Sequence, residues 1–362
     1  MAKQSSLHEF HISHGASFVE RDGWLLPEHF GDPAGEYEAV RSAVGLIDRS
    51  QRGLLQFTGP DRVSFLQGML SNDLRPLKTF DGQAATLLTQ QGKVIADVRV
   101  LCAMNSLYLD CWQNLKDKII DHLNRYLVAD EVEIADRSEQ YATLSLQGPK
   151  AEALLLETLG PGDLPAQPKQ HAMVTLDGAA VCVVRDSHLG ETGFDLIIPA
   201  ASLPGSARSL SEAGKSFAAA WVGEQAQNVL RVEAGIPRYG IDFSEDNLLL
   251  EVGLEQAVSF NKGCYLGQEV VERIRSRGHV NRKLCGLLLE GQHPAQPGDP
   301  LRANGKEVGH ITSSVLSPRF KRPIALGYLN KDFWRPGTEL AVARSDGTVR
   351  ATVSALPFAS SS

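Results

Sequence analysis

The sequence lacks any apolar run long enough to cross a membrane. A transmembrane helix needs about 20 consecutive apolar residues, and no stretch of the 362-residue chain approaches that length. The N-terminal segment MAKQSSLHEFHISHG has neither the apolar core of a signal peptide nor the Arg-rich, acid-poor composition of a transit peptide. We therefore expect a cytoplasmic protein without a membrane partner.

Cysteine is also scarce. The chain has five cysteines, widely spaced and without a CxxC pair: Cys102, Cys111, Cys182, Cys264 and Cys285. The odd number and the spacing argue against a disulfide framework, and the missing CxxC pairs argue against a closed zinc or iron–sulfur site built by this chain alone. His8, His11 and His14 recur at three-residue intervals, but no carboxylate completes a ligand set. We predict no metal site.

Basic residues are outnumbered, with 36 Lys and Arg against 43 Asp and Glu and a formal net charge of −7 at pH 7. A protein built around a phosphate backbone usually shows the opposite balance or one dense basic face. We therefore expect no direct nucleic acid binding over the whole surface. One local basic segment, from Arg273 to Lys283, is compatible with a solvated helix face and linker, with a site for an acidic tail or partner, or with RNA contact.

What is present is an ordinary globular composition, 43% hydrophobic, with one repeated local pattern. Gly53–Leu70 and Tyr141–Leu159 each show an alternating strand, a Gly-Pro step and an apolar-periodic helix. Proline is tolerated in the first helical turn because its missing N–H would have no helical partner there. The repeat predicts an α+β fold with two related, ferredoxin-like halves, residues 46–140 and 141–283, and with residues 1–45 packed on them.

The texture of the chain changes at residue 284. From there on, short strand-like segments are separated by Gly, Pro and Asn-Gly turns, and Asn304-Gly305 is a strong hairpin signal. Several short strands at this spacing predict a small antiparallel β-barrel over residues 284–358. The predicted organisation is thus a bipartite region, residues 1–283, followed by a barrel.

Several segments resemble the folate-binding superfamily that contains the glycine-cleavage T-protein. SHGASFVERDGWLLPEHFGDP and GLLQFTGPDRVSFLQGMLSNDL are similar to its N-terminal third, and GETGFDL and LRVEAGIPRYGIDF to its second half. The string KGCYLGQE resembles the marker of the YgfZ branch. The likeness covers nearly the whole chain, and it implies a ring of domains around a central folate pocket.

The resemblance to the YgfZ branch implies a protein that binds tetrahydrofolate, or a one-carbon derivative of it, and assists the assembly or repair of iron–sulfur clusters. Its clients would include enzymes that modify tRNA, and its partners would be iron–sulfur assembly or client proteins. In the T-protein branch the same scaffold is an aminomethyltransferase, so a folate-dependent one-carbon transferase is the alternative. We expect the first function, and on that expectation the chain is not a classical enzyme.

The family match also suggests side chains that bind the cofactor. Glu191, in the glycine-bracketed loop HLGETGFDL, is the expected carboxylate for the N–H groups of the pterin, unless it is a solvated loop acid. Arg231 matches an arginine that the family uses near folate; the alternative is a helix-surface arginine paired with Glu233 or Asp242. Tyr239 is expected to wall the cleft, or else to be half-buried core.

Asp97 is the fourth residue that the resemblance suggests for binding the cofactor. It lies in the strand GKVIADVRV, where the resembled aminomethyltransferases carry a pair of acids. Ala96 stands where the first acid of the pair is expected. Neighbouring residues of a strand point to opposite faces, so Asp97 cannot simply replace its neighbour, and the sequence leaves open which acid is catalytic. We interpret the missing acid as evidence against aminomethyl transfer.

Cys264 and Lys262 are the residues of KGCYLGQE that we predict to carry chemistry. Gly263 and Gly267 allow a tight turn, and the residues that follow have helical periodicity. Cys264 would then precede a helix N-terminus close to Lys262, and both features favour a thiolate. We expect a redox or cluster-linked thiol beside the folate; the alternative is a small buried cysteine at a glycine turn. No Cys–His signature supports a hydrolytic nucleophile.

Overall fold

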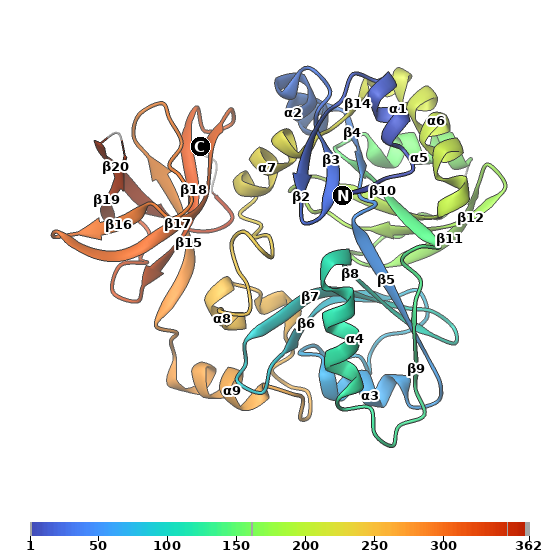
Figure 1. The fold of residues 1–362 in the computed structure, drawn as a ribbon, viewed down its shortest axis with the longest axis horizontal. Coiled ribbons are helices and arrows are strands. Elements are labelled where there is room, and N and C mark those ends of the chain that lie inside the picture. The colour runs from blue at the N-terminus through green and yellow to red at the C-terminus, as the bar shows by residue number, and fades with distance from the viewer. Residues whose placement is uncertain (1, 161, 346, 359–362) are drawn as a thin grey trace. The chain divides into compact units, whose positions relative to one another are not determined.

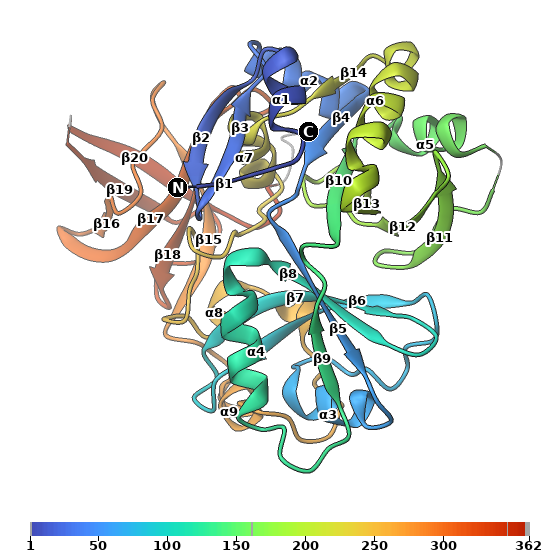
Figure 2. The same ribbon diagram turned by 45° about the vertical axis from the view of Figure 1, so that its right-hand side comes forward.

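The computed structural model describes residues 2–160, 162–345 and 347–358, which form two compact units. The first unit comprises Met1–Leu87 and Ala96–Gln227, and the second comprises Leu88–Ile95 and Asn228–Ser362. Figures 1 and 2 show the elements in chain order, coloured from blue to red. Within the described ranges, no helix is both long and apolar enough to cross a membrane.

A five-stranded sheet of the first unit has the ferredoxin-like plan. Its strand order is β6-β7-β8-β5-β9. Along the chain, the strand β5 is followed by the helix α3, the strands β6, β7 and β8, the helix α4 and the strand β9. Without β6, this is the strand, helix, two strands, helix and strand order of the ferredoxin-like plan. Helix α4 packs on β5 with Ile119 and Leu123 fully buried (Figure 2). The elements are β5 (Arg52–Thr58), α3 (Arg62–Met69), β6 (Gly82–Leu88), β7 (Val94–Cys102), β8 (Leu107–Trp112), α4 (Lys116–Asn124) and β9 (Glu133–Asp136).

A six-stranded sheet of the same unit repeats this plan, with order β11-β12-β13-β10-β4-β14. Strand β4, from an earlier part of the chain, takes the place beside β10, and β14 pairs with it in parallel. Leu154 and Leu155 of α5 pack with Phe194 of the sheet in one apolar core. The elements are β4 (Val44–Asp48), β10 (Tyr141–Gln147), α5 (Ala151–Leu159), β11 (His171–Leu176), β12 (Ala179–Arg185), β13 (Gly193–Pro199), α6 (Leu203–Gly214) and β14 (Ala219–Trp221).

The N-terminal segment adds a three-stranded sheet of order β1-β3-β2 and two helices to the first unit. Its elements are β1 (Lys3–Gln4), α1 (His8–Ser13), β2 (Ser17–Arg21), β3 (Trp24–His29) and α2 (Pro33–Ser42). The side chain of Asp32 caps α2 by accepting a hydrogen bond from the backbone N–H of Gly35 at 3.0 Å. His11 is buried, with its Nε2 2.9 Å from Asp48 Oδ2. Among the described residues, no group of three or more potential metal ligands is found.

The second unit contains a closed barrel of order β15-β18-β17-β16-β19-β20, and its strands pair in antiparallel fashion among the described residues. Its inward-facing side chains, such as Leu287, Leu301 and Leu329, are fully buried. The elements are α7 (Glu224–Glu233, which begins in the first unit), α8 (Leu249–Val252), α9 (Gln268–Arg277), β15 (Arg282–Leu289), β16 (Pro300–Ala303), β17 (Lys306–Ser317), β18 (Arg322–Asn330), β19 (Glu339–Arg344) and β20 (Gly347–Ser354).

The predicted α+β fold with a C-terminal antiparallel barrel is therefore confirmed. The barrel begins with β15 at Arg282, close to the change of texture in the sequence. The arrangement of the parts as a ring around a folate pocket stays a prediction.

Candidate active site

A buried cluster of charged side chains lies where the two large sheets of the first unit meet. Arg99 on β7 is 5% exposed. Its Nη1 donates to Asp186 Oδ2 at 2.6 Å and to Asp195 Oδ2 at 2.8 Å, and its Nη2 donates to Asp110 Oδ2. Arg52 on β5 donates from Nε to Asp110 Oδ1 at 2.6 Å. One arginine of the five-stranded sheet thus holds two carboxylates of the other half of the unit.

Two further cations complete the pairing. Arg49, between β4 and β5, donates from Nη1 to Asp195 Oδ2 at 2.8 Å, and Lys169 pairs with Asp186 Oδ1. Burial raises the pKa of Asp186, but Lys169 and Arg99 outweigh it and bring that pKa to about 2. Burial alone would also raise the pKa of Asp195, but the positive charges of Arg49 and Arg99 outweigh burial. The net shift lowers the pKa of Asp195. Both carboxylates are therefore ionised at neutral pH.

Asp97 differs from the other carboxyl groups of this cluster. It lies two residues before Arg99 on β7, and therefore on the same face of the strand. The side chain is half-buried, and its Oδ1 is buried without a hydrogen-bond partner among the described residues. Burial raises the pKa of Asp97; Asp110 adds to the shift, and Arg52 and Arg49 oppose it. A carboxyl group with a raised pKa keeps its proton where an ordinary aspartate is ionised, which makes it a candidate general acid.

Ala96 lies on the opposite face of β7 and is fully buried, as is Val100 four residues later. An acid at position 96 would thus enter the apolar side of the sheet. The acid that the chain retains is the one on the charged face, so the replacement at position 96 leaves that face intact. Whether the missing acid at position 96 affects transferase chemistry stays a prediction.

His188 joins the same cluster from the loop between β12 and β13. Arg49 Nη1 lies 3.3 Å from His188 Nδ1, and the other ring nitrogen, Nε2, is buried without a hydrogen-bond partner among the described residues. Burial, followed by the charge of Arg49, lowers the pKa of His188 to about 3. The imidazole is therefore neutral at physiological pH. The sequence offered no signal for this residue beyond its place in the loop that carries Glu191.

Glu191 lies three residues further along that loop. Arg41 on α2 donates from Nη1 to Glu191 Oε1 at 2.6 Å, and the glutamate side chain keeps 28% of its surface exposed. The residue is therefore neither a freely solvated loop acid nor fully buried. Its predicted contact with a pterin stays a prediction.

Arg231, in the second unit, is buried and fully engaged within that unit. It donates from Nη1 to Asp242 Oδ2 at 2.7 Å and from Nη2 to Ser313 Oγ on β17 at 2.8 Å. The pairing with Asp242 is the one that the sequence suggested as an alternative, although the arginine is buried and not on a helix surface. Tyr239 is half-buried, with its ring centroid 5.3 Å from that of Phe243. Their roles toward folate stay predictions.

Cys264 is exposed, which excludes the buried-core alternative. It lies four residues before the first residue of α9, and Gly267 precedes that helix with φ of +84°. Lys262 is buried, with Nζ 5.0 Å from the centroid of the Tyr265 ring. This geometry does not test the chemical role that we predicted for Cys264 and Lys262. That role stays a prediction.

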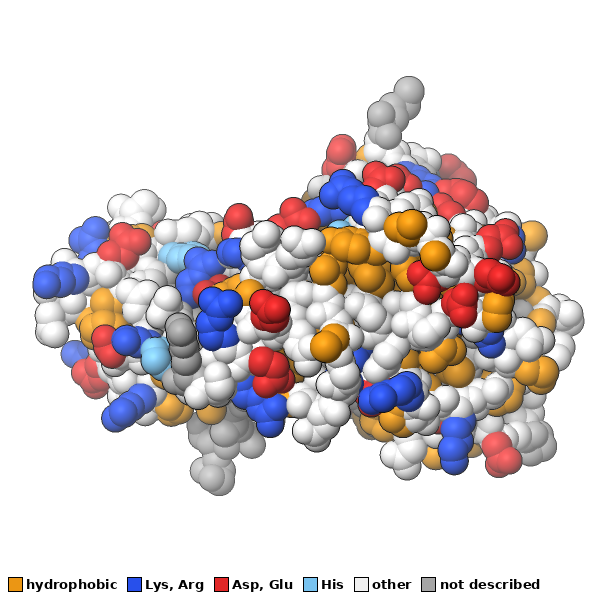
Figure 3. Space-filling model, turned by 90° about the horizontal axis from the view of Figure 1, so that it is seen from below, with side chains coloured by type: hydrophobic (Ala, Val, Ile, Leu, Met, Phe, Trp, Pro, Cys, Tyr) orange, Lys and Arg blue, Asp and Glu red, His pale blue; other side chains and the backbone are white. Residues whose placement is uncertain are grey.

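The basic segment from Arg273 to Lys283 is partly neutralised within its own unit. Arg282 Nε lies 3.1 Å from Glu251 Oε2, and Arg275 donates to the backbone carbonyl of Phe260 at 3.2 Å. On the face of the molecule in Figure 3, Lys and Arg side chains are interspersed with Asp and Glu.

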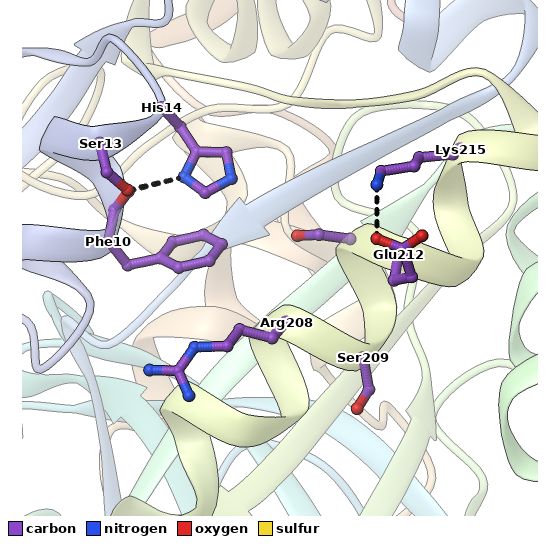
Figure 4. A pocket seen from close by; sticks show the side chains of 8 residues that line it. Phe10, Ser13, His14, Arg208, Ser209, Glu212 and Lys215 are labelled. Carbon is purple, nitrogen blue, oxygen red and sulfur yellow. Dashed lines mark hydrogen bonds and ion pairs between the residues drawn. The ribbon is translucent and has the colours of Figure 1, made fainter.

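A hollow of about 580 Å³ lies between α1 and α6 (Figure 4), and no residue of the charged cluster lines it. On its rim, Lys215 Nζ lies 2.5 Å from Glu212 Oε2. None of the residues that we predicted for the site lines it: its walls are Phe10, Ser13, His14, Arg208, Ser209, Ser211, Glu212 and Lys215. We therefore take the charged cluster, and not this hollow, as the candidate active site.

Comparisons with known families, with relatives in sequence and with solved structures all lead to one protein family. The family described as "GCVT N-terminal domain" matches residues 7–262, and the "Glycine cleavage T-protein C-terminal barrel domain" matches residues 282–359. An aminomethyltransferase of Rubrobacter xylanophilus is 34% identical over 98% of this chain and 94% of its own length, and one of Caldanaerobacter subterraneus subsp. tengcongensis is 31% identical over 97% and 94%. The crystal structure of glycine cleavage system aminomethyltransferase T from Bartonella henselae superposes with a TM-score of 0.92 at 26% identity, covering 99% of both chains.

These relatives correct our functional expectation. A role in iron–sulfur cluster assembly or repair, with tRNA-modifying enzymes as clients, is wrong: the full-length relatives at 29–34% identity are named aminomethyltransferases. The comparisons favour the alternative that we set beside it. Our expectation that the chain is not a classical enzyme depended on the iron–sulfur role and is no longer supported.

Proposed function

Because the chain belongs to the glycine-cleavage T-protein family, we propose that it is a folate-dependent transferase of the aminomethyltransferase type, acting in the cytoplasm. The proposed donor is an aminomethyl group carried on the thiol of a lipoyl carrier protein, and the proposed acceptor is tetrahydrofolate. The products are methylene-tetrahydrofolate, the free dihydrolipoyl thiol and ammonia, so the reaction needs no oxidant. The observation that carries the proposal is the carboxyl group of Asp97, whose Oδ1 is buried without a partner among the described residues and whose pKa is raised by burial within a cluster of fixed charges.

The residues of the charged cluster suit a flat, polar ligand. Four buried atoms of the cluster have no hydrogen-bond partner among the described residues: Asp97 Oδ1, His188 Nε2, Asp195 Oδ1 and Arg99 Nε. A buried polar atom left without a partner costs about 1–3 kcal/mol, so a ligand is stabilised by that amount for each of these atoms with which it pairs. Reduced folate carries N–H groups and a ring carbonyl suited to such atoms. Glu191 is the other folate contact that we propose within this unit, and the roles of Arg231 and Tyr239 toward folate stay predictions.

Tetrahydrofolate supplies N5 and N10, the two nitrogens that bond to the one-carbon unit as its bonds to the nitrogen and the sulfur of the donor break. Asp97 supplies the proton that the leaving nitrogen of the donor requires when its C–N bond breaks, and one folate N–H returns a proton to Asp97. The proton of the second folate N–H goes to the thiolate that leaves when the C–S bond breaks. The carboxylate that remains is stabilised by Arg52 and Arg49, the cations that act on Asp97 in the resting protein. Arg49 is held by its pair with Asp195, which Arg99 also contacts, and Arg52 is held by its pair with Asp110. Neither Arg49 nor Arg52 therefore needs to reorganise at the moment of proton transfer.

The test is an assay of the full chain with tetrahydrofolate and an aminomethyl-loaded lipoyl carrier protein. We expect ammonia and methylene-tetrahydrofolate to form in equal amounts. Asp97→Asn, which keeps the shape of the side chain but cannot donate an acidic proton, should lower kcat by about 10²–10⁴-fold and leave the Kd for tetrahydrofolate within a few-fold of the wild-type value.

Asp117→Asn is the matched control, because Asp117 lies on α4 with 84% of its side chain exposed. It should retain the wild-type kcat. Failure of the wild-type chain to release ammonia from a carrier that an authentic T-protein consumes would contradict the proposed function. An unchanged kcat in Asp97→Asn would contradict the role of Asp97 alone.

Within the family, the string KGCYLGQE supports a proposed place in the YgfZ branch. This finer placement rests on one short segment around Cys264. The proposed reaction depends on the charged cluster and on the family, and not on that segment.

A further inference from the structure

His188 carries a hydrogen-bond donor that the described part of the protein does not use. A guanidinium group only donates hydrogen bonds, so Nδ1 of His188 must be the acceptor in its 3.3 Å contact with Arg49 Nη1. A neutral imidazole has one protonated nitrogen, and the proton is therefore on Nε2. That atom is buried and has no partner among the described residues.

Arg49 fixes this tautomer firmly because it is itself held in place. Its Nη1 also donates to Asp195, and Asp195 is in turn held by Arg99. Asp195 Oδ1 has no partner among the described residues, but it lies 4.0 Å from His188 Nδ1, which is too far for a hydrogen bond. A proton on Nδ1 would therefore face the guanidinium of Arg49 at 3.3 Å without an acceptor within reach. His188 thus presents a donor at Nε2 and cannot present an acceptor there without breaking its contact with Arg49.

The loop that carries His188 offers two complementary groups within three residues. Glu191 is an acceptor for N–H groups, and His188 Nε2–H is a donor for a carbonyl oxygen. The edge of a pterin ring has the matching pattern, N–H groups next to a ring carbonyl. An acceptor and a donor on one short loop therefore suit the pterin edge better than either would alone.

We propose that His188 Nε2–H donates a hydrogen bond to the ring carbonyl oxygen of the bound reduced pterin and so selects folates against 4-amino analogues. This inference rests on the proposed function, because it concerns the same ligand. In a 4-amino analogue, an amino group replaces the carbonyl, and its N–H groups would face the N–H of His188. A site built around one hydrogen bond discriminates strongly against a ligand that lacks the partner atom, since buried polar groups are then left unpaired.

The first experiment is a thermodynamic cycle measured by calorimetry on the full chain. The ligands are tetrahydrofolate and tetrahydroaminopterin, and the proteins are the wild type and His188→Phe. We expect His188→Phe to raise the Kd for tetrahydrofolate about tenfold, the value of one buried hydrogen bond, and to leave the Kd for the 4-amino analogue within about threefold. Discrimination between the two ligands should therefore shrink about tenfold.

The second experiment needs no variant for its main result. In the wild-type chain labelled with ¹⁵N-histidine, the resonance of His188, assigned as the one missing from His188→Phe, should show the neutral tautomer protonated at Nε2. Saturation with tetrahydrofolate should shift the Nε2–H signal and slow its exchange with water. A merely structural histidine would show neither change.

The outcomes separate this inference from the proposed function. If the wild type binds tetrahydrofolate and transfers the one-carbon unit, but His188→Phe weakens both ligands equally or neither, the role of His188 is overturned and the function stands. A proton on Nδ1 in the wild-type spectrum would overturn the role of His188 as well. If the wild type does not bind tetrahydrofolate at all, the proposed function and this inference fall together.

Discussion

Asp97 and His188 lie inside a cluster of ionised side chains, and burial disfavours the charged form of both groups. Burial raises the pKa of Asp97 and lowers that of His188. For Asp186 and Asp195, the neighbouring cations outweigh burial and keep the carboxylates ionised. The pKa values of the aspartates in one buried cluster thus shift in opposite directions, according to which side chains are paired.

His188 makes the stability of the protein sensitive to acid. Its pKa is lowered to about 3, so between an ordinary value of 6.5 and about 3 the unfolded chain binds a proton that the native state does not, and stability falls as the pH falls. The charged groups around it are Arg49, Lys169, Asp186 and Asp195, and the pKa values of the two carboxylates are lowered, so both stay ionised over this window. We expect wild-type stability to fall relative to His188→Phe by about 1.4 kcal/mol for each pH unit below 6.5.

Urea unfolding of both proteins at pH 7, 6 and 5 measures this difference. A constant difference in unfolding free energy across the three pH values would show that His188 titrates normally in the native state.

Asp97 acts in the opposite pH direction. Its pKa is raised in the native state, so the native state holds a proton that the unfolded chain has lost, and stability declines as the pH rises through the native pKa. Asp97→Asn should therefore be more stable than the wild type at pH 8, by about 1 kcal/mol, with a smaller gain at pH 5. Thermal unfolding at the two pH values tests this; a variant equally destabilised at both would argue against a strained, protonated carboxyl group.

At the scale of elements, the two Gly-Pro steps are the clearest link between sequence and fold. Gly59 precedes α3 with φ of +98°, and Gly148 precedes α5 with φ of +135°. An added Cβ would lie 2.0 Å from the carbonyl oxygen of Glu131 at the first position and 2.5 Å from that of Ala43 at the second. In both halves, glycine is required by the conformation and by the close approach of another backbone segment.

Replacing either glycine by alanine should therefore be costly. We expect Gly59→Ala and Gly148→Ala to lower the free energy of unfolding by about 2–3 kcal/mol each. Gly68 is the matched control, because it lies within α3 and a Cβ there meets no atom within 4 Å. Gly68→Ala should be neutral or stabilise by about 0.5–1 kcal/mol. Urea denaturation of the three variants decides; equal losses at all three positions would contradict this account.

Local patterns in the sequence predict much of the fold, and they fail where a distant segment decides. The apolar periodicity of residues 219–234 predicts one continuous helix. Instead, β14 pairs in parallel with β4, and α7 begins only at Glu224. Gly223 separates them, and a Cβ there would lie 2.3 Å from the carbonyl oxygen of Glu28. Strand pairing over more than 170 residues of sequence outweighs the local helical preference.

The same reason limits what the sequence shows of the site. Asp97 and Glu191 are predicted from the family resemblance, which expects an acid in that hairpin strand and a carboxylate in that glycine-bracketed loop. Arg49, Asp110 and His188 carry no local signal. They meet only because the packing of two sheets brings β7, β8 and the loop after β12 together.

At the scale of the whole molecule, the chain matches its aminomethyltransferase relatives over nearly its entire length. Both α+β halves and the barrel are therefore shared with them. Within the second unit, the barrel is tied to the preceding chain by Asp242, which pairs with Arg231 and accepts a hydrogen bond from Ser313 Oγ at 2.7 Å. Three separate segments of the chain meet at this carboxylate.

Removing the arginine would leave a buried carboxylate without its cation. We expect Arg231→Ala to lower the free energy of unfolding by about 3–5 kcal/mol, measured by urea denaturation with circular dichroism. Arg275→Ala, which removes an arginine 3.6 Å from Glu272 on the exposed side of α9, should change it by less than about 1 kcal/mol. Equal effects of the two variants would contradict a structural role for the Arg231–Asp242 pair.

The central claim is that this chain transfers an aminomethyl-derived carbon to tetrahydrofolate. The most direct measurement is a single turnover with the protein in excess, in which the carrier-bound aminomethyl carbon is ¹³C-labelled and its fate is followed by NMR. The account predicts that the label moves to the methylene position of tetrahydrofolate, with one ammonia released for each label, and that Asp97→Asn slows this step by about 10²-fold or more. Label that stays on the carrier while tetrahydrofolate is bound to the wild-type protein would contradict it.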